Sequence, residues 1–391
     1  MRIAFVSDAY IPVPTGVAVS LQTLKVSLEK MGHTVYVFAP DYFGFKDQDP
    51  HIARLPAIFS MHEKYRPTRW PLVKIKRHQV EQLKIDIVHS HYFFKNFDFA
   101  IRLAKAAKAP LVASVYRIFP EIAKLKPSFL QGAQSAYENS LNDMICYLNK
   151  CQGVVALSSS SKKYLSAFPI NTSIETIPVG IFPKDFAGFP PQTVKAKFSI
   201  PQERKIVLFV GRIEDDKNLK FLLKSFKNIW KAIDDVHLLI VGGGSKLKYY
   251  QQIAALLPYN KFITFTGYLP KSYVNKIYST ASVLAYCAQL DPQPLAVLES
   301  LAAGTPVVAI KGLGAQDFIS ENIDGFVTRN DIADFSEKII ELLRRDKMQM
   351  EFSLNARREI QAFRSSNLTA DLVKFYEQIQ EQTKTDFYDN T

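Results

Sequence analysis

Two cations follow an apolar strand in the second half of the chain. The strand residues are Ile206–Val210, and Arg212 and Lys217 stand five residues apart in the loop behind it. Guanidinium and ammonium groups at the carboxyl end of a strand suit a diphosphate, because both donate charge-assisted hydrogen bonds to phosphate oxygens. The alternative is a solvated loop of mixed charge, since three acids lie between the two cations.

Two carboxylates form a second candidate group. Asp291 and Glu299 stand eight residues apart, across the expected junction between a loop and a helix. Carboxylate oxygens accept hydrogen bonds from vicinal hydroxyls, so a sugar and a ribose are suitable ligands. Acids that complement a helix dipole are the alternative. That alternative explains Asp291 better than Glu299, because Glu299 lies inside the apolar run Leu295–Leu301.

Two glycine-containing turns could bring backbone amides close to a ligand. The run Gly242–Gly244, with Gly243 at its centre, follows an apolar strand, and Gly16 follows the first strand of the chain. Each turn also has the simpler interpretation of a chain reversal that binds nothing.

We expect two parallel sheets in series to position these residues. Apolar strands alternate with helical segments, and this pattern starts again at Lys205, which is typical of doubly wound α/β domains. Ligands of such sheets bind at the carboxyl ends of the strands, where the candidate residues fall. The expected strands are Arg2–Val6, Thr34–Phe38, Ile85–Val88, Leu111–Val115, Gly153–Leu157, Lys205–Val210, Leu238–Val241, Phe262–Phe265, Ser282–Tyr286 and Pro306–Ala309.

A length of 391 residues favours two domains. The stretch Ile181–Pro191 is rich in Gly, Pro and Phe and reads as a connecting segment. We therefore expect two Rossmann-like domains facing across a cleft. The first comprises residues 1–182 and the second residues 183–367, and a helix from about residue 368 to 391 packs back on the first domain.

The net charge of +12 is concentrated in the first half, where residues 1–180 hold 22 Lys and Arg against 13 Asp and Glu. Such a surplus favours a membrane surface, a nucleic acid or a phosphorylated substrate, or is a generic solvated face. Nucleic acid fits poorly, because no recognised nucleic-acid module is present. Three cysteines without metal-ligand spacing suit a reducing cytosol. We expect neither a signal peptide nor a transmembrane helix.

A basic segment stands out between residues 64 and 77, with six cations and no acid. Cations interleaved with an aromatic and several aliphatic residues are typical of an element that lies on anionic lipid. A helix whose lysine stems cover a core face is the alternative. The candidate membrane or acceptor residues are Lys64, Arg66, Arg69, Trp70, Lys74, Lys76 and Arg77.

Several of these motifs, taken in order, resemble family 4 of the retaining glycosyltransferases. They are VGRIEDDKN at 210–218, DPQPLAVLE at 291–299 with PVVA at 306–309, and IPVGIFPKDF at 177–186. The opening residues 7–21 and DIVHSHYFF at 86–94 resemble the branch that includes the bacterial diacylglycerol glucosyltransferases. The resemblance covers nearly the whole chain and implies the GT-B fold.

The resemblance implies a retaining transfer of a hexose, with glucose favoured, from a UDP-sugar to a membrane glycerolipid such as diacylglycerol. It implies no metal and no cofactor beyond the UDP-sugar, because Arg212 and Lys217 would neutralise the diphosphate leaving group. Glu299 would bind the ribose and Asp291 the sugar hydroxyls. The implied catalytic residues are Arg212, Lys217, Asp291 and Tyr116, and the implied donor-binding residues are Gly16, Arg212, Lys217, Gly243, Tyr268, Asp291, Leu295 and Glu299. The enzyme would work on the cytoplasmic face of the membrane.

The chain departs from the family pattern near the sugar and the acceptor. Asp291 replaces a longer Glu, and Pro292 and Pro294 stand where small residues with a backbone N–H are usual. Tyr116 stands where the family has a histidine, and a tyrosine is a poor base near neutral pH, since its ordinary pKa is about 10. These changes leave three hypotheses: shifted specificity, an acceptor that is a glycan or a protein, or a catalytically silent nucleotide-binding or regulatory subunit.

The pair His89 and His91 lies close to Tyr116 in the expected sheet. Either histidine could line the site, or both could simply end a strand.

Overall fold

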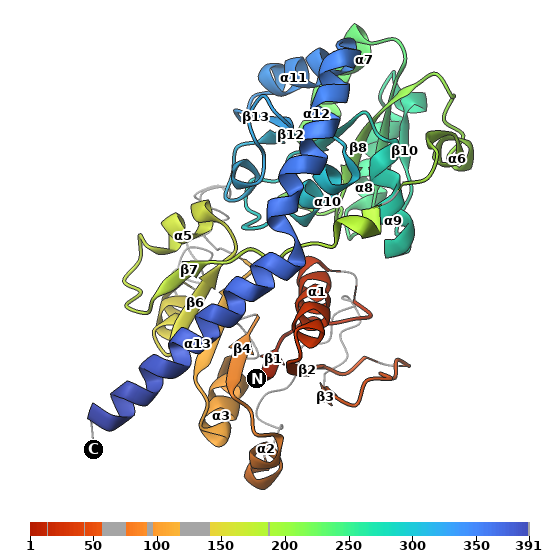
Figure 1. Ribbon diagram of the computed structural model, residues 1–391. Coiled ribbons are helices and arrows are strands. Elements are labelled where there is room, and N and C mark those ends of the chain that lie inside the picture. Colours follow the sequence, from red (N-terminus) through yellow and green to blue (C-terminus); the bar gives the residue numbers. More distant parts are fainter. Residues whose placement is uncertain are drawn as a thin grey trace, which may run out of the picture. The chain divides into compact units, whose positions relative to one another are not determined.

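The computed structural model describes residues 1–389 apart from 14, 43, 57–75, 92–96, 118–140 and 187. The chain forms two compact units (Figure 1). Unit 1 comprises Met1–Gly180 and Ser365–Thr391, and unit 2 comprises Ile181–Arg364. Among the residues described, no helix is long and apolar enough to cross a membrane.

Unit 1 contains a seven-stranded parallel sheet in the order β3-β2-β1-β4-β5-β6-β7. The strands are β1 Arg2–Val6, β2 Thr34–Pro40, β3 Ile52–Leu55, β4 Ile87–Ser90, β5 Leu111–Val115, β6 Gly153–Ala156 and β7 Ile174–Thr176. The helices include α1 Gly16–Lys30, α2 Arg77–Leu83, α3 Phe97–Ala107, α5 Ser159–Leu165 and α13 Ser365–Asp389, and residues 141–148 are helical as well. Strands β1, β4, β5 and β6 are almost fully buried, which explains their continuous apolar sequences.

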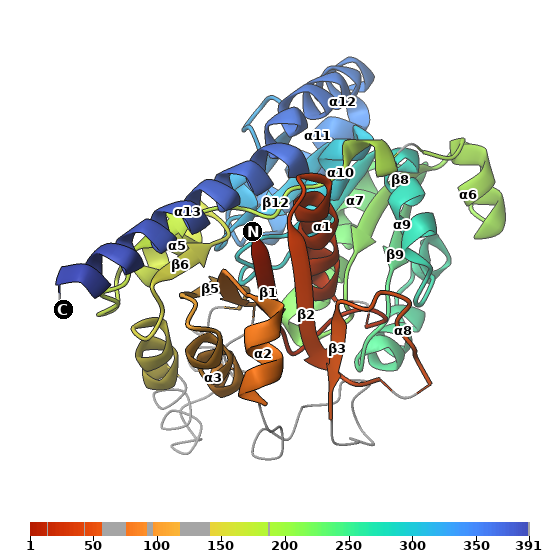
Figure 2. The ribbon, with the colours of Figure 1, turned by 60° about the horizontal axis from the view of Figure 1, so that its bottom comes forward.

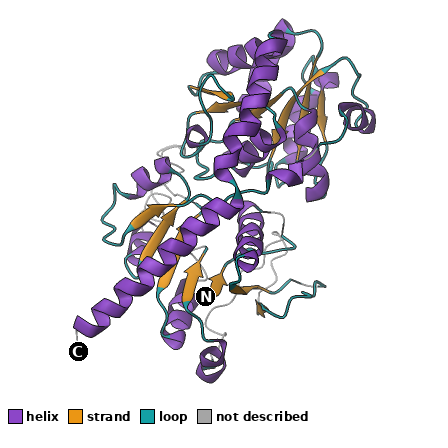
Figure 3. Ribbon diagram, viewed as in Figure 1, coloured by secondary structure: helices purple, strands orange, loops and turns teal. Residues whose placement is uncertain are grey.

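Unit 2 repeats the design with six parallel strands in the order β10-β9-β8-β11-β12-β13. The strands are β8 Lys205–Val210, β9 Val236–Val241, β10 Ile263–Phe265, β11 Val283–Tyr286, β12 Val307–Ile310 and β13 Gly325–Thr328. The helices are α6 Pro191–Lys197, α7 Leu219–Ala232, α8 Leu247–Ala255, α9 Lys271–Ile277, α10 Leu295–Ala303, α11 Ile332–Arg344 and α12 Asp346–Glu359, with short 3-10 turns η3 Asp215–Lys217, η4 Asn260–Phe262 and η5 Tyr278–Thr280. Helices cover the sheet of each unit (Figure 3).

Both sheets reverse their winding direction at one point. In unit 1 the first strand, β1, has neighbours β2 and β4, and in unit 2 the first strand, β8, has neighbours β9 and β11. Loops that leave two strands on either side of such a reversal diverge and open a crevice for ligands. The loops after β8 and β11 carry Arg212 and Asp291, so the fold of unit 2 brings the two candidate groups to one place.

The sequence predicts the central strands and misses three others. Strands β3, β7 and β13 all lie at sheet edges. Only Leu55 of β3 and no residue of β7 is buried, so no continuous apolar run marks these strands. The prediction that Phe262 begins a strand is wrong, because Phe262 ends the 3-10 turn η4.

The C-terminal helix α13 packs on unit 1 (Figures 1 and 2). Leu372, Phe375 and Ile379 of α13 belong to the same buried cluster as Phe5. Gly153 opens β6 directly beneath this helix, where an added Cβ would lie 2.6 Å from the Phe375 ring. Unit 1 therefore completes its core with residues from the far end of the chain.

Candidate functional site

The loop after β8 is bound to the loop after β9. The backbone N–H of Ile213 donates to the Gly243 carbonyl at 2.9 Å, and that of Ser245 donates to Oε1 of Glu214 at 2.7 Å. Gly242 has a φ of +135°, and a Cβ there would lie 1.9 Å from the Gly211 carbonyl oxygen. The glycine run therefore has a packing role of its own, which is to hold the loop that carries Arg212.

Tyr268 lies against this glycine turn. A Cβ on Gly243 would lie 2.4 Å from Cε2 of Tyr268, whose side chain is 52% exposed. The absence of a side chain at Gly243 thus leaves the space that the Tyr268 ring occupies. The structure therefore brings together two residues of the implied donor set that are 25 residues apart in the sequence.

The two cations of the β8 loop share one acid. Asp216 lies 3.3 Å from Nη2 of Arg212 and 3.7 Å from Nζ of Lys217. Lys217 ends η3, and Asn218 takes the left-handed conformation (φ 54°) that turns the chain into α7. Arg212 is 41% exposed and Lys217 only 13%. The loop therefore has the mixed charge that the alternative of a solvated loop predicts. It also holds two cations close to the same acid.

Asp291 receives hydrogen bonds on both carboxylate oxygens. Nζ of Lys217 lies 2.6 Å from Oδ1, and the hydroxyl of Tyr286 donates to Oδ2. Burial by itself raises the pKa of Asp291, but the charge and hydrogen bond of Lys217, the Tyr286 hydroxyl and Arg212 outweigh it and lower that pKa. Asp291 is therefore a carboxylate held beside the two cations.

Glu299 has the same kind of partners. The buried hydroxyl of Tyr278 donates to Oε2 at 2.7 Å, and the ammonium of Lys271 pairs with Oε1. Its side chain is 7% exposed and projects from the middle of α10. An acid that caps a helix dipole would lie in the first turn, so this alternative does not apply to Glu299.

The loop that carries Asp291 is closely packed against the loop after β12. Pro292 is buried, Pro294 is the N-cap of α10, and Leu295 is the first residue of that helix. A Cβ on Gly314, in the loop after β12, would lie 2.6 Å from the Asp291 carbonyl oxygen. The prolines that remove two N–H donors thus also belong to a tightly constrained turn.

Four partners of the site were missed by the sequence reasoning. They are Asp216, Lys271, Tyr278 and Tyr286. Tyr286 ends β11, and its position at the carboxyl end of a strand could have indicated that it lies near the site. Lys271 and Tyr278 come from α9 and η5, and no spacing in the sequence connects them with Glu299.

The remaining implied site residues, Gly16 and Tyr116, belong to unit 1. Gly16 is exposed and opens α1, where Oγ1 of Thr15 accepts a hydrogen bond from Ala18 N at 3.2 Å. The hydroxyl of Tyr116 lies 3.3 Å from Nδ1 of His91. Burial raises the pKa of Tyr116 far above its ordinary value, so this tyrosine stays protonated and cannot act as a base.

His89 and His91 are fully buried, and the interpretation that they end a strand applies. His89 makes hydrogen bonds to the Tyr376 hydroxyl at 2.5 Å and to the Ser114 hydroxyl at 2.8 Å. Burial lowers the pKa of His89 to about 3, so it is neutral in the fold. Both ring nitrogens of His89 are engaged inside unit 1, so this histidine has no free nitrogen to offer a ligand.

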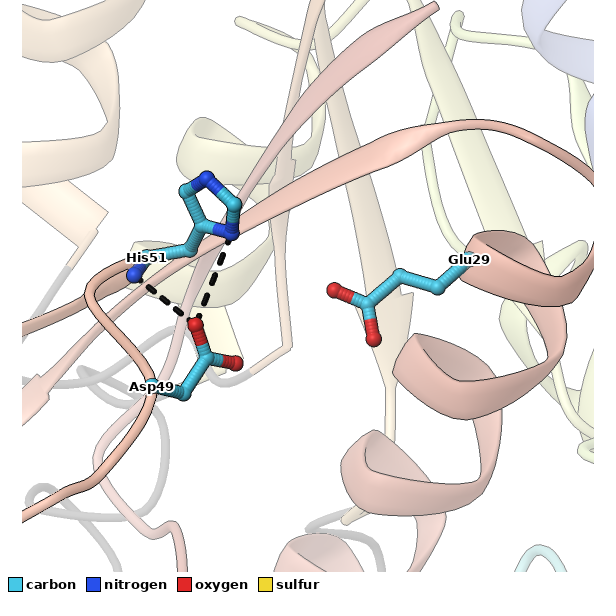
Figure 4. Close-up of side chains that lie close together, drawn as sticks. All are labelled: Glu29, Asp49 and His51. Carbon is cyan, nitrogen blue, oxygen red and sulfur yellow. Dashed lines mark hydrogen bonds and ion pairs between the residues drawn. The ribbon is translucent and has the colours of Figure 1, made fainter.

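One group of side chains in the described part of the chain has the composition of a metal site. Glu29, Asp49 and His51 lie together in unit 1 (Figure 4). The ammonium of Lys25, which is 4% exposed, pairs with Glu29 and lies 2.6 Å from Asp49. This lysine already supplies the positive charge that the two carboxylates require, so the group is explained without a metal.

The basic segment is only partly described. Lys64, Arg66, Arg69, Trp70 and Lys74 lie outside the described residues. Lys76 is the N-cap of α2, and Arg77 opens this helix and pairs with Glu81 at 3.2 Å. Both cations are exposed.

Comparison with known proteins identifies the class that this fold and site define. A family model described as Glycosyltransferase Family 4 matches residues 14–184, and one described as Glycosyl transferases group 1 matches residues 192–359. The chain therefore belongs to the family 4 glycosyltransferases and is a glycosyltransferase of the GT-B fold.

Among curated relatives, the alpha-monoglucosyldiacylglycerol synthase of Streptococcus pneumoniae is 28% identical over 83% of this chain and 74% of that protein. The synthase of the same name from Acholeplasma laidlawii is 25% identical over 79% of this chain and 80% of that protein. These relatives agree with the branch suggested by the opening residues.

Solved structures agree in fold. Sucrose-phosphate synthase from Thermosynechococcus elongatus has a TM-score of 0.75 at 20% identity, covering 97% of this chain and 98% of that one. The Anabaena protein HepE in complex with UDP-glucose has a TM-score of 0.75 at 16% identity, covering 98% of this chain and 100% of that one.

Proposed function

We propose that this protein transfers a hexose, foremost glucose, from a UDP-sugar to a membrane glycerolipid such as diacylglycerol, with retention of configuration. The observation that carries the proposal is the gathering of Arg212, Lys217 and Asp291 at the reversal point of the unit 2 sheet. The names of the synthases from Streptococcus and Acholeplasma support the glycerolipid, and the complex of HepE supports the donor.

The chemistry proposed for the site is electrostatic. When the sugar departs, the UDP diphosphate gains negative charge, and Arg212 and Lys217 stabilise that charge without a metal ion. Asp291 binds hydroxyls of the transferred sugar, and Glu299 binds the ribose. Tyr268 frames the base, and the leaving phosphate helps to deprotonate the acceptor hydroxyl, a task for which the protonated Tyr116 is unsuited.

The acceptor side of the proposal requires the protein to lie on the cytoplasmic face of a membrane. The basic stretch from residue 64 to 77 supports this arrangement, because each Lys or Arg near an anionic surface contributes about 1 kcal/mol. A generic basic face remains the competing explanation.

The test combines binding with turnover. Calorimetry with UDP in EDTA measures donor binding, and radiolabelled UDP-glucose with vesicles of diacylglycerol and anionic phospholipid measures transfer. We expect binding in EDTA, labelled lipid, and a loss of roughly 10²- to 10³-fold in kcat for Arg212→Ala. Arg329→Ala is the matched control, since Arg329 is 84% exposed and pairs with Asp334, five residues along the chain. A protein that binds neither UDP nor UDP-glucose would overturn the proposal.

A catalytically silent nucleotide-binding subunit is the second candidate. The prolines at 292 and 294 and the tyrosine at 116 favour it, because they remove two N–H donors and a base. This candidate predicts UDP binding without labelled product on any acceptor. Labelled glycan or protein without labelled lipid would instead show that the acceptor is a glycan or a protein.

A further inference from the structure

Tyr286 makes one contact that the proposed chemistry does not use. This tyrosine ends β11, is 6% exposed, and its hydroxyl donates to Oδ2 of Asp291. Phenylalanine would fill the same apolar space, because the ring belongs to the core cluster that contains Leu284 and Val297. The hydroxyl is therefore the part of Tyr286 that packing does not explain.

The same arrangement occurs twice in unit 2. Asp291 is bonded by Tyr286 and Lys217, and Glu299 is bonded by Tyr278 and Lys271. In both cases a buried tyrosine and a more exposed lysine approach the carboxylate. The tyrosine is fixed by the core, whereas the lysine can rotate about its four-carbon stem.

Lys217 has two competing partners once a donor is present. In the structure its ammonium lies 2.6 Å from Oδ1 of Asp291. A diphosphate beside Arg212 carries more negative charge than one carboxylate and attracts the same ammonium. When Lys217 contacts the diphosphate, its hold on Asp291 weakens, and the Tyr286 hydroxyl remains as the fixed donor to that carboxylate.

We propose that Tyr286 is a positioning residue, whose hydroxyl keeps Asp291 oriented toward the sugar while Lys217 engages the diphosphate. This inference rests on the proposed function, because it assigns a task to Tyr286 within the same donor site.

The pKa shifts of both residues agree with a hydrogen bond that Tyr286 donates and Asp291 accepts. Burial, with the nearby Asp291 charge, raises the pKa of Tyr286 well above its ordinary value, so its hydroxyl keeps the proton that it donates. The hydrogen bond from Tyr286 is one of the effects that lower the pKa of Asp291 against the opposing effect of burial. Removing the hydroxyl should therefore raise the pKa of Asp291.

The test is Tyr286→Phe, with Tyr259→Phe as the matched control. Tyr259 is also buried in unit 2, and its hydroxyl donates to the Leu223 carbonyl at 3.1 Å, away from the site. For Tyr286→Phe we expect kcat/KM for UDP-glucose to fall about 10- to 100-fold, the loss of one hydrogen bond to a charged group. The Kd for UDP, which has no sugar, should stay within about twofold of the wild type, since Arg212, Lys217 and Glu299 are unchanged.

The pH profile separates positioning from a structural role. We expect the acidic limb of kcat/KM to move up by about one pH unit in Tyr286→Phe, because Asp291 takes up a proton more readily. In Tyr259→Phe we expect no movement of that limb. An equal fall in UDP affinity and thermal stability for Tyr286→Phe, with an unmoved acidic limb, would show a structural role and overturn the inference.

A second variant keeps the test decisive. Asp291→Glu lengthens the side chain by one methylene and pushes its carboxylate against the Tyr286 hydroxyl. We expect Asp291→Glu to be harmful alone and partly rescued when combined with Tyr286→Phe, which opens the space of one oxygen. Purely additive losses in this double-mutant cycle would contradict the inference. If the wild type transfers no sugar, both the proposed function and the role of Tyr286 are overturned. If the wild type transfers sugar and the pH profile of kcat/KM is unchanged in Tyr286→Phe, only the role of Tyr286 is overturned.

Discussion

Two carboxylates in unit 2, those of Asp291 and Asp324, differ in the groups that surround them. Asp291 lies between Lys217 and Tyr286, which together lower its pKa. Asp324 has no such cation: Oδ1 accepts a hydrogen bond from Ser320 N at 2.9 Å, and Oδ2 has no hydrogen-bond partner among the described residues. Burial, together with the charge of Glu359, raises the pKa of Asp324 to about 7. The surroundings of Asp291 thus favour its charged form, whereas burial of Asp324 opposes its charged form.

Asp324→Asn should stabilise the protein at alkaline pH. Because the folded pKa lies above the ordinary value, the native state holds its proton while the unfolded chain ionises. The contribution of Asp324 to the free energy of unfolding is therefore fully present below about pH 4. It decreases by as much as about 4 kcal/mol as the pH rises through about 7. Urea unfolding at pH 5 and pH 8 measures it. We expect Asp324→Asn to reduce the difference between the two pH values, and Asp346→Asn, at a 76% exposed side chain, to leave it unchanged. An unaltered pH dependence in Asp324→Asn would contradict the prediction.

Helix α13 is the element whose role depends most on contacts distant in sequence. Its Tyr376 is bonded to His89 on β4, 287 residues away, and its Ser365 hydroxyl lies 2.5 Å from that of Ser27 on α1. We expected a helix from about residue 368 to 391 that packs back on the first domain. The strand that it contacts could not be inferred, because the sequence of residues 365–389 does not specify which part of the sheet the helix covers.

Tyr376→Phe should destabilise unit 1 by about 1–3 kcal/mol, because it leaves Nδ1 of His89 buried without a partner. Chemical denaturation followed by circular dichroism measures the loss. Lys374→Ala serves as the control on the same helix, since Lys374 is 71% exposed. Equal stabilities of Tyr376→Phe and the wild type would show that the bond to His89 contributes nothing.

At the scale of the whole molecule, Arg212, Lys217, Asp291 and Glu299 all belong to unit 2, whereas Gly16, which is also implied in donor binding, belongs to unit 1. The ends of that unit meet, since Ile181 N donates to the Phe363 carbonyl at 3.0 Å. The unit also has its own buried clusters on both faces of its sheet. These features indicate that unit 2 can be separated from unit 1 without disturbing Arg212, Lys217, Asp291 and Glu299.

A fragment of residues 181–364 should therefore fold and bind UDP with a Kd within about tenfold of the full chain, because domains with their own core fold as units. It should transfer no sugar, because the acceptor side is missing. Calorimetry with UDP and a vesicle transfer assay measure the two properties. A folded fragment that does not bind UDP would show that unit 1 supplies nucleotide contacts.

The sequence by itself determined the class of fold, the central strands and the main donor-site candidates. Those features are local in the sequence. Apolar runs mark the buried strands, and only a few residues separate Arg212 from Lys217 and Asp291 from Glu299. Only the tertiary structure decided which groups face each other. Lys217 meets Asp291 across 74 residues, and Lys271 meets Glu299 across 28, because parallel strands bring the loops at their carboxyl ends to one edge of the sheet. Local spacing does not encode such pairings, and so the tyrosine and lysine partners of the two carboxylates appeared only in the folded chain.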